Sequence, residues 1–231
     1  MPTARDLVQA ALSEGRKVLL EHEAKALIGD YGIPVTRVKV AKSEDEAVEF
    51  AREIGLPVVL KIVSPDVLHK SDVGGVKVNL KTEEEVRRAY REIIENVKSK
   101  VPNARIVGIL VQEFAPSGVE VIIGLIRDPQ FGPTVMFGLG GVFVEVFKDV
   151  SFRVAPLTER DAYEMIEEIK GKVLLEGYRG TQPADKKAIA DALIKVGQIG
   201  LEIPEIKEMD LNPIMAYPTG IKVVDARVIL G

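Results

Sequence analysis

The sequence contains no cysteine and no tryptophan among its 231 residues. Without cysteine, the chain has no disulfide scaffold, no thiolate metal ligand and no cysteine nucleophile. Long apolar runs are also missing, because stretches such as residues 58–63 fall far short of the roughly 20 residues that cross a bilayer. The first residues have the pattern of an amphipathic helix with acidic side chains rather than of a signal peptide. We therefore expect a cytoplasmic protein with no membrane association.

A large excess of charge of either sign is absent as well. The chain has 31 Lys and Arg against 35 Asp and Glu, for a net charge of −4. Because the two signs are interspersed, no broad cationic face is available, and we expect no nucleic-acid partner. The hydrophobic content of 46 % is that of an ordinary globular protein, and a chain of this length can bury one large core or two modest ones.

Capping patterns and apolar spacing predict the helices and strands. Ser43 with Glu46, and Thr82 with Glu85, have the pattern of capping boxes, and each pair precedes apolar residues at helical spacing. Further helices are predicted at 158–169 and 185–199. Strands are predicted at 35–40, 58–63, 76–80, 105–113, 119–126, 134–137, 142–147, 152–155, 206–216 and 221–228. Because hairpins are mixed with strand–helix alternation, we expect an α+β fold of two lobes, with the ligand in the cleft between them.

Lys61 interrupts the apolar run at 58–63. A lysine in such a run either points to solvent from an edge strand or acts as a point charge that binds phosphate. The turn-rich segment that follows contains Gly74 and Gly75, whose backbone N–H groups can approach an anion closely. This context favours the phosphate-binding interpretation.

His69 lies in the same segment, beside Lys70. A neutral imidazole is a competent nucleophile, so a histidine near lysines and glycines is suitably placed to accept a phosphoryl group. The alternative is a loop histidine that caps backbone groups. The other histidine, His22, is predicted to face solvent, because the apolar stripe of its helix lies on the opposite side.

Glu113 and Glu120 lie on two successive strands, on either side of an Ala-Pro-Ser-Gly turn. Periodicity alone makes both of them solvent-facing strand residues. A nucleotide pocket, however, needs acceptors for an exocyclic amine and for ribose hydroxyls. Both carboxylates are therefore candidates for nucleotide binding.

Oxygen donors gather in a predicted hairpin near the end of the chain. Asp210 and Asn212 share one face of a strand by the two-residue period. If the hairpin turns at Pro218 and Thr219, Asn212 falls opposite Asp225, and three oxygen ligands of the kind that Mg²⁺ prefers come together. The alternative is an Asx-Pro turn at a polar strand end.

Several of these motifs together resemble one known family, the β subunits of ADP-forming acetyl-CoA synthetases. The motifs are Lys61, His-Lys-Ser-Asp-Val-Gly-Gly-Val at 69–76, Gln-Glu-Phe at 112–114, Arg-Asp-Pro-Gln-Phe-Gly-Pro at 127–133, Phe-Gly-Leu-Gly-Gly at 137–141 and Asp-Leu-Asn-Pro at 210–213. The resemblance covers essentially the whole chain. It implies an ATP-grasp fold related to the succinyl-CoA synthetase β subunit. In that fold, residues of about 20–105 form the smaller lobe with the Lys61 strand and the His69 loop, while 1–19 and 106–231 form the larger lobe.

The resemblance also implies roles for the nucleotide-binding residues. Lys61 contacts the nucleotide phosphates beside the Gly74 and Gly75 loop. Glu113 lines the adenine pocket, and Glu120 faces the ribose. The implied nucleotide is ATP or ADP.

Matching positions further imply the metal and catalytic residues. Asn212 and Asp225 match the family's Mg²⁺ ligands, and Asp210 stands close to the metal and to phosphoryl transfer. His69 matches the histidine that is phosphorylated. A phosphate contact is also considered for Arg153, whose role the spacing does not assign.

The implied reaction is acyl-CoA, ADP and phosphate giving the free acid, CoA and ATP, which is the activity of an acid–thiol ligase. The other half of this reaction needs a CoA-binding domain and a second reactive histidine, and the sequence has a fingerprint for neither, since no Gly-x-Gly-x-x-Gly follows a first strand. We therefore expect a separate CoA-binding α subunit, in an α2β2 heterotetramer. Two alternatives are a non-catalytic ATP-grasp module that senses nucleotide and an ATP-grasp carboxylate–amine ligase. The presence of Lys61, His69, Asn212 and Asp225 argues against the sensor, which does not need these residues. In the ligase His69 would be dispensable, so one substitution separates it from the first interpretation.

Overall fold

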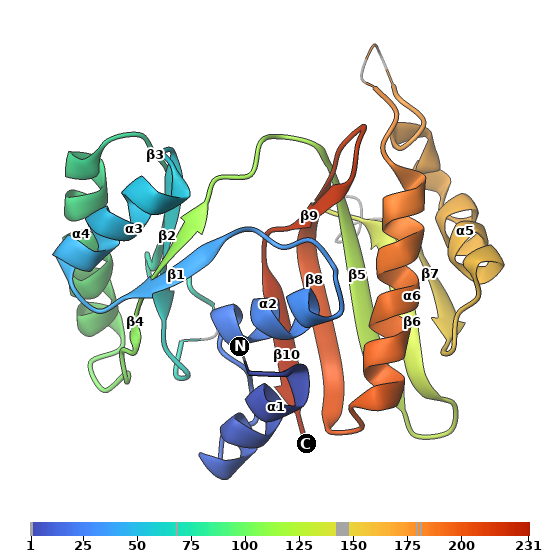
Figure 1. The fold of residues 1–231 in the computed structure, drawn as a ribbon, viewed down its shortest axis with the longest axis horizontal. Coiled ribbons are helices and arrows are strands. Elements are labelled where there is room, and N and C mark those ends of the chain that lie inside the picture. Colours follow the sequence, from blue (N-terminus) through green and yellow to red (C-terminus); the bar gives the residue numbers. More distant parts are fainter. Residues whose placement is uncertain (1, 68, 142–147, 179, 181) are drawn as a thin grey trace. The chain divides into compact units, whose positions relative to one another are not determined.

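The computed structural model describes residues 2–67, 69–141, 148–178, 180 and 182–231, and its helices and strands are labelled in Figure 1. The chain forms two compact units. Unit 1 comprises Met1–Leu19, Glu23–Val35 and Pro116–Gly231, and unit 2 comprises Leu20–His22 and Thr36–Ala115. The predicted α+β content is confirmed in each unit.

Unit 2 is a four-stranded antiparallel sheet with two helices packed on it. The strands run in the order β1-β4-β2-β3, and their bounds are Val38–Ala41 (β1), Val58–Val63 (β2), Val76–Leu80 (β3) and Gly108–Glu113 (β4). Helix α3 (Glu44–Ile54) contacts β1 and β4, and helix α4 (Glu83–Lys100) contacts β2 and β3. Because β2 lies between β3 and β4, it is an interior strand, and all six of its residues are buried.

The predicted caps begin both helices of unit 2. The Thr82 hydroxyl accepts a hydrogen bond from the Glu85 N–H, and the Glu85 carboxylate accepts one from the Thr82 N–H, each at 3.2 Å. Ser43 accepts from the Glu46 N–H at 3.2 Å. These bonds satisfy N–H groups that a helix start otherwise leaves without an intrahelical partner. Each helix then buries one apolar face against the sheet.

Unit 1 is a six-stranded antiparallel sheet with its helices gathered around it. Its path is β10-β8-β5-β6-β7, with β9 paired to β8. The strands are Val119–Asp128 (β5), Gly132–Leu139 (β6), Val150–Val154 (β7), Ile206–Ala216 (β8), Ile221–Val223 (β9) and Ala226–Leu230 (β10). The helices are Ala4–Ser13 (α1), Glu21–Asp30 (α2, whose first two residues belong to unit 2), Glu159–Glu168 (α5), the 3-10 helix Lys170–Leu174 (η2) and Lys186–Glu202 (α6).

The core of unit 1 lies on one face of this sheet. Figure 1 shows α2 and α6 on the same side of it, and alternate strand residues such as Ile123, Phe137 and Leu211 join Leu27 and Leu193 in one buried cluster. The strand positions in between carry their side chains to the opposite face. That second face is where the polar residues of β8 emerge.

Two predicted boundaries differ from the structure. The lobe division expected near residue 105 falls later, because β4 pairs with β1 and β2 and so belongs to unit 2. Conversely, residues 23–35 belong to unit 1, where Leu27 and Ile28 join its core. The predicted strand at 142–147 lies outside the described residues.

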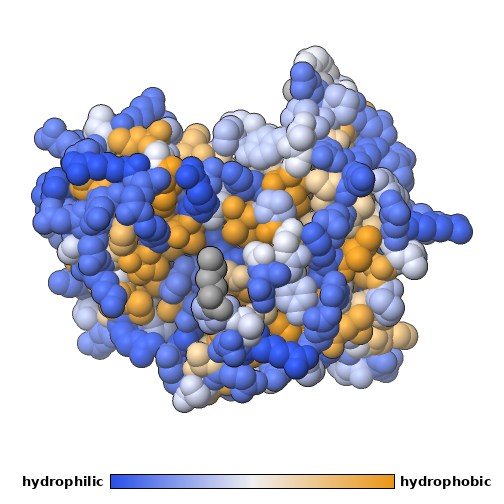
Figure 2. Space-filling model, viewed as in Figure 1, coloured by the Kyte–Doolittle hydropathy of each residue, from blue (hydrophilic) through white to orange (hydrophobic). Residues whose placement is uncertain are grey.

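On the face drawn in Figure 2, hydrophilic residues predominate over the two helices of unit 2, with hydrophobic residues between them. Arg52 pairs with Glu83, and Arg87 pairs with Asp45 and Glu44, bridging α3 to α4. Such exposed pairs contribute little to stability and mainly keep this face solvated. Among the helices that the structure describes, none combines the length and the apolar character that crossing a bilayer requires.

Candidate nucleotide and phosphoryl-transfer site

Lys61 lies in the middle of β2, with Leu110 and Val76 as its neighbours on the flanking strands. Its side chain is buried, and its Nζ donates a hydrogen bond to Glu21 Oε1 at 2.7 Å. The edge-strand alternative is therefore wrong, since β2 is an interior strand and the lysine does not point to solvent. A buried lysine has lost rotamer freedom on folding, so its charge is held at one place before any ligand arrives.

The segment between β2 and β3 carries His69, whose side chain is exposed. Both ends of this segment are fixed by hydrogen bonds. On one side, the Asp66 carboxylate accepts from the Arg105 N–H at 2.7 Å. On the other, the Gly75 carbonyl accepts from the Ile62 N–H at 2.8 Å. His69 thus lies exposed between two anchored stretches.

The backbone N–H groups of Gly74 and Gly75 do not have the anion-binding role that the sequence indicates. The Gly74 N–H donates to the Ser71 carbonyl at 3.0 Å, and the Gly75 N–H donates to the Lys70 carbonyl at 2.7 Å. In this conformation neither group is available to cradle an anion, so that expectation is corrected. Glycine is needed here for space, because a Cβ on Gly75 would lie 2.7 Å from a methyl group of Ile62.

Glu113 ends β4 and is largely buried, contrary to the solvent-facing alternative. Its carboxylate accepts from the Arg37 N–H at 3.0 Å, while its own N–H donates to the Arg37 carbonyl. Glu120 is exposed near the start of β5. Its carbonyl accepts from Gly140 at 2.8 Å, and a side chain on Gly140 would collide with Glu120.

The hairpin of β8 with β9 and β10 has the predicted register. The Asn212 N–H donates to the Asp225 carbonyl at 3.2 Å, and Leu211 pairs with Ala226. The turn closes through a bond from the Tyr217 N–H to the Gly220 carbonyl, which centres it between Pro218 and Thr219. Asn212 and Asp225 therefore stand opposite each other.

Asp210 occupies the open face of the unit 1 sheet, two residues before Asn212. Both line a hollow of about 350 Å³ whose walls include Met136, Phe152 and Arg227. Gly124 pairs with Asp210 on the neighbouring strand and also lines this hollow. The pKa of Asp210 is raised, first by withdrawal from water and then by the charge of Asp225, with Arg227 opposing the rise.

Each unit thus carries its own part of the predicted set. Unit 2 holds Lys61, His69, Gly74, Gly75 and Glu113, and unit 1 holds Glu120, Asp210, Asn212 and Asp225. Within the described ranges, no group of three or more acidic, histidine or cysteine side chains is arranged to hold a metal. The metal hypothesis therefore depends on the two carboxylates and the Asn212 amide.

Three residues of these surroundings were not predicted. The position of Arg227 could have been predicted from the hairpin register, because Arg227 pairs with Asp210 when Asn212 pairs with Asp225. Glu21 and Lys70, which contact each other, are 49 residues apart, and no local pattern signals their contact. Arg153, considered for phosphate, instead pairs with Glu168 and Glu164 of α5.

Comparison with known proteins places the chain in a family. An ATP-grasp domain profile matches residues 10–230. The β subunit of acetate–CoA ligase (ADP-forming) I from Pyrococcus furiosus is 56 % identical over 98 % of this chain and 97 % of its own. Acetate–CoA ligase (ADP-forming) I from Archaeoglobus fulgidus is 50 % identical over 99 % of this chain, which matches 33 % of that longer protein.

A solved structure gives the same result in three dimensions. The acetyl-coenzyme A synthetase 1 of Ca. Korarchaeum cryptofilum, in complex with coenzyme A and Ca-AMPCP, superposes with a TM-score of 0.97 and 72 % identity, over 99 % of this chain and 100 % of that one. Further structures of that protein contain a phosphorylated phosphohistidine segment, or Mg-AMPPCP with the segment pointing towards the nucleotide binding site. This chain therefore belongs to the ATP-grasp family, among the β subunits of the ADP-forming acetate–CoA ligases.

Proposed function

We propose that this chain is the nucleotide-binding subunit of an ADP-forming acyl-CoA synthetase and exchanges a phosphoryl group between ATP and His69. The observation that carries the proposal is the 72 % identity, along 99 % of the chain, to a protein whose structures hold coenzyme A, nucleotide analogues and a phosphohistidine segment. The coupled reaction converts acyl-CoA, ADP and phosphate into the free acid, CoA and ATP, with acetyl-CoA as the proposed substrate. A CoA-binding α subunit completes the enzyme as an α2β2 assembly.

In the transfer step one bond forms and one bond breaks. An imidazole nitrogen of His69 attacks the γ-phosphorus of ATP, the N–P bond forms, and the bond to the β-γ bridging oxygen breaks to release ADP. In the synthetic direction, ADP takes the phosphoryl group back from His69. The exposed imidazole suits both directions, since it has to meet a second phosphoryl partner away from the nucleotide.

Lys61 supplies a fixed positive charge for the nucleotide phosphates. Its position inside β2 keeps the ammonium from relaxing away as negative charge shifts towards the leaving ADP. Glu113, held by Arg37, and Glu120 are proposed as acceptors for the adenine amine and the ribose hydroxyls.

The hairpin residues fit a magnesium ion by their chemistry. An amide oxygen from Asn212 and carboxylates from Asp225 and Asp210 are hard oxygen donors, and Mg²⁺ typically takes one or two carboxylates and completes its shell with water and phosphate. The raised pKa of Asp210 fits the same assignment, because a bound cation offsets both the withdrawal of the carboxylate from water and its repulsion by Asp225. When bound, the ion would neutralise charge on the nucleotide phosphates.

Phosphorylation of the purified chain by ATP tests the proposal. We expect an acid-labile phosphate on the peptide that contains His69, and none on the peptide that contains His22, the only other histidine. His69→Ala should retain nucleotide binding within about twofold, because the imidazole is the acceptor and not a binding group, yet form no phosphoprotein.

A second measurement distinguishes the alternatives. With the α subunit present, His69→Ala should lose synthetase turnover. Full turnover by this variant would contradict the phosphohistidine mechanism and favour a ligase that forms an acyl phosphate directly. Absence of phosphorylation and turnover in the wild-type complex, despite nucleotide binding, would favour a nucleotide sensor.

A further inference from the structure

One buried carboxylate, that of Glu21, binds two lysines at once in unit 2. Its Oε1 accepts from Lys61 Nζ at 2.7 Å, and its Oε2 accepts from Lys70 Nζ at 2.5 Å. The Glu21 side chain is only 3 % exposed, against 7 % for Lys61 and 21 % for Lys70. Removing one partner from such a buried arrangement leaves an uncompensated charge, which is strongly unfavourable. The three side chains therefore hold each other in place.

Lys70 is fixed through its main chain as well as through its ammonium group. Its carbonyl accepts from the Gly75 N–H at 2.7 Å, and the Gly75 carbonyl accepts from the Ile62 N–H at 2.8 Å. Ile62 directly follows Lys61 in β2. Side-chain and main-chain hydrogen bonds thus form a closed circuit: they link Glu21 to Lys70, Lys70 to Gly75, and Gly75 to β2, whose Lys61 binds Glu21.

His69 is the residue immediately before Lys70, so this circuit limits where the imidazole can go. Effective phosphoryl transfer requires the nucleophile to lie within about 3–3.5 Å of phosphorus and in line with the leaving group, and a misplacement of about 1 Å can cost on the order of 100-fold. A residue that fixes Lys70 therefore acts on His69 without contacting the nucleotide.

The charges of the cluster fit the same role. One carboxylate faces two ammonium groups, so among these three residues one positive charge is in excess. Glu21 also begins α2, where the helix dipole favours a negative side chain. The carboxylate can thus hold both lysines at the same place.

We propose that Glu21 is a positioning residue for phosphoryl transfer: it holds Lys70, and through Lys70 the His69 segment, at the strand that carries Lys61. This inference rests on the proposed phosphorylation of His69 and adds a residue that acts through another. It predicts that the effect of changing Glu21 is transmitted by Lys70.

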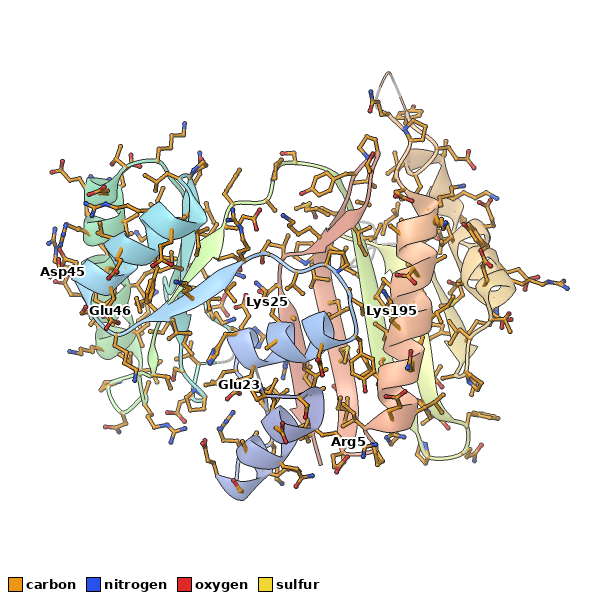
Figure 3. The ribbon with its side chains drawn as sticks, in the orientation of Figure 1. Arg5, Glu23, Lys25, Asp45, Glu46 and Lys195 are labelled. Carbon is orange, nitrogen blue, oxygen red and sulfur yellow. The ribbon has the colours of Figure 1, made fainter. Side chains whose placement is uncertain are left out.

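Three variants test the inference. Glu21→Gln keeps the shape and removes the charge, and Lys70→Met removes the ammonium from the other side. Glu23→Gln is the matched control, since Glu23 lies on the same helix (Figure 3), has a side chain only 16 % exposed and pairs with Arg16 at 2.7 Å. The readouts are single-turnover phosphorylation of His69 by ATP and backbone hydrogen exchange across residues 66–75 in the nucleotide-free chain.

For Glu21→Gln we expect phosphorylation to slow by about 10- to 100-fold, with the ATP concentration for half-maximal rate changed less than about threefold, because position rather than nucleotide affinity is lost. Exchange at Gly74 and Gly75 should accelerate by about 10-fold. Lys70→Met should reproduce both effects, and adding Glu21→Gln to it should slow the reaction no further than about twofold. The control should stay within about twofold of wild type.

Other results would overturn the inference. If Glu21→Gln raises the ATP concentration for half-maximal rate but leaves the maximal phosphorylation rate unchanged, Glu21 acts on Lys61 and not on His69. If the two substitutions slow the reaction independently and additively, Lys70 does not transmit the effect. Hydrogen exchange reports on the segment even when no phosphoryl donor is present. A wild-type chain that fails to be phosphorylated would therefore refute the proposed function, while unchanged exchange in both variants would refute the positioning role.

Discussion

At the scale of single residues, folding disfavours the charged form of Asp210. Its pKa is raised above the ordinary 3.8, so the folded chain holds the carboxyl proton more tightly than the unfolded chain does. The stability that this provides is present below pH 3.8 and is lost as pH rises through the raised value. Where the carboxyl is ionised, its charge therefore lowers the stability of the folded chain.

Asp225→Asn should separate this effect on stability from the effect on the metal site. The amide keeps an acceptor for the Ala226 N–H, which now donates to Asp225 Oδ1 at 2.9 Å, and it removes the charge that faces Asp210. In metal-free buffer at pH 7 we expect Tm to stay unchanged or to rise by up to about 2 °C. The Mg²⁺ concentration for half-maximal phosphorylation of His69 should rise by at least about 10-fold, because a charged ligand is lost.

Asp191→Asn provides the comparison, since Asp191 is an exposed carboxylate that pairs with Lys195 on the surface of α6. It should leave the Mg²⁺ titration unchanged. A Mg²⁺ titration of Asp225→Asn that overlies the wild-type curve would remove Asp225 from the metal site, whatever happens to Tm.

Residue pairing could be predicted where one local rule fixes it. A two-residue turn at Pro218 and Thr219 sets the whole register of the hairpin, so the sequence places Asn212 opposite Asp225. The contact between Glu21 and Lys70 has no such rule. It joins two residues of unit 2 that lie 49 positions apart, and such a contact is decided by the tertiary structure rather than by any periodic pattern.

At the scale of elements, the predictions were confirmed where local residue patterns, such as a helix cap or a turn, determine where a helix or strand begins or ends. The β2, β3 and β8 strands have the predicted bounds, and α4 begins at its predicted cap. The strand predicted at 221–228 is divided into β9 and β10. Pro213 pairs with Val224 at the break, accepts its N–H at 3.0 Å and has no N–H to return, so the ladder is interrupted there.

The turn that closes the His69 segment gives a prediction at this scale. Gly75→Ala places a methyl group 2.7 Å from Ile62 Cγ2 and 2.9 Å from the Lys70 carbonyl, so the turn must open. We expect His69 phosphorylation to slow by about 10-fold or more and Tm to fall, as for other substitutions that force overpacking. Phosphorylation rates and thermal denaturation measure the two effects.

Gly29→Ala is the matched glycine substitution. Gly29 lies inside α2, and a Cβ there meets nothing closer than 4.0 Å. Alanine in a helix interior should raise the free energy of unfolding by about 0.5–1 kcal/mol and leave phosphorylation unchanged. Equal phosphorylation rates for the two variants would show that the closed turn is not needed for transfer.

At the scale of the whole molecule, the sequence predicted the fold through its motifs more than through its periodicity. Strand patterns alone indicated an α+β protein, and the ATP-grasp assignment came from several motifs spread over nearly the whole chain, which the comparisons confirm. The boundary between the units differs from the predicted one, because the strand pattern of residues 105–115 does not indicate which of the two sheets the strand joins. Only their pairing with β1 and β2 assigns them.

The last prediction concerns what the chain does by itself. The proposed exchange between nucleotide and His69 uses only groups of this chain, namely Lys61, the hairpin of Asn212 with Asp225, and the exposed His69. A β subunit from Pyrococcus furiosus matches along 97 % of its length, whereas the single-chain Archaeoglobus ligase is matched over only 33 % of its own, so about two thirds of that enzyme lies outside the shared part. The isolated chain should therefore bind ATP and phosphorylate His69, yet form no ATP from acetyl-CoA, ADP and phosphate. Turnover should appear when the CoA-binding α subunit is added at equal concentration, and His69→Ala in the same complex should remain inactive. Comparable ATP formation by the chain alone would place both half-reactions here and would refute the two-subunit division of the chemistry.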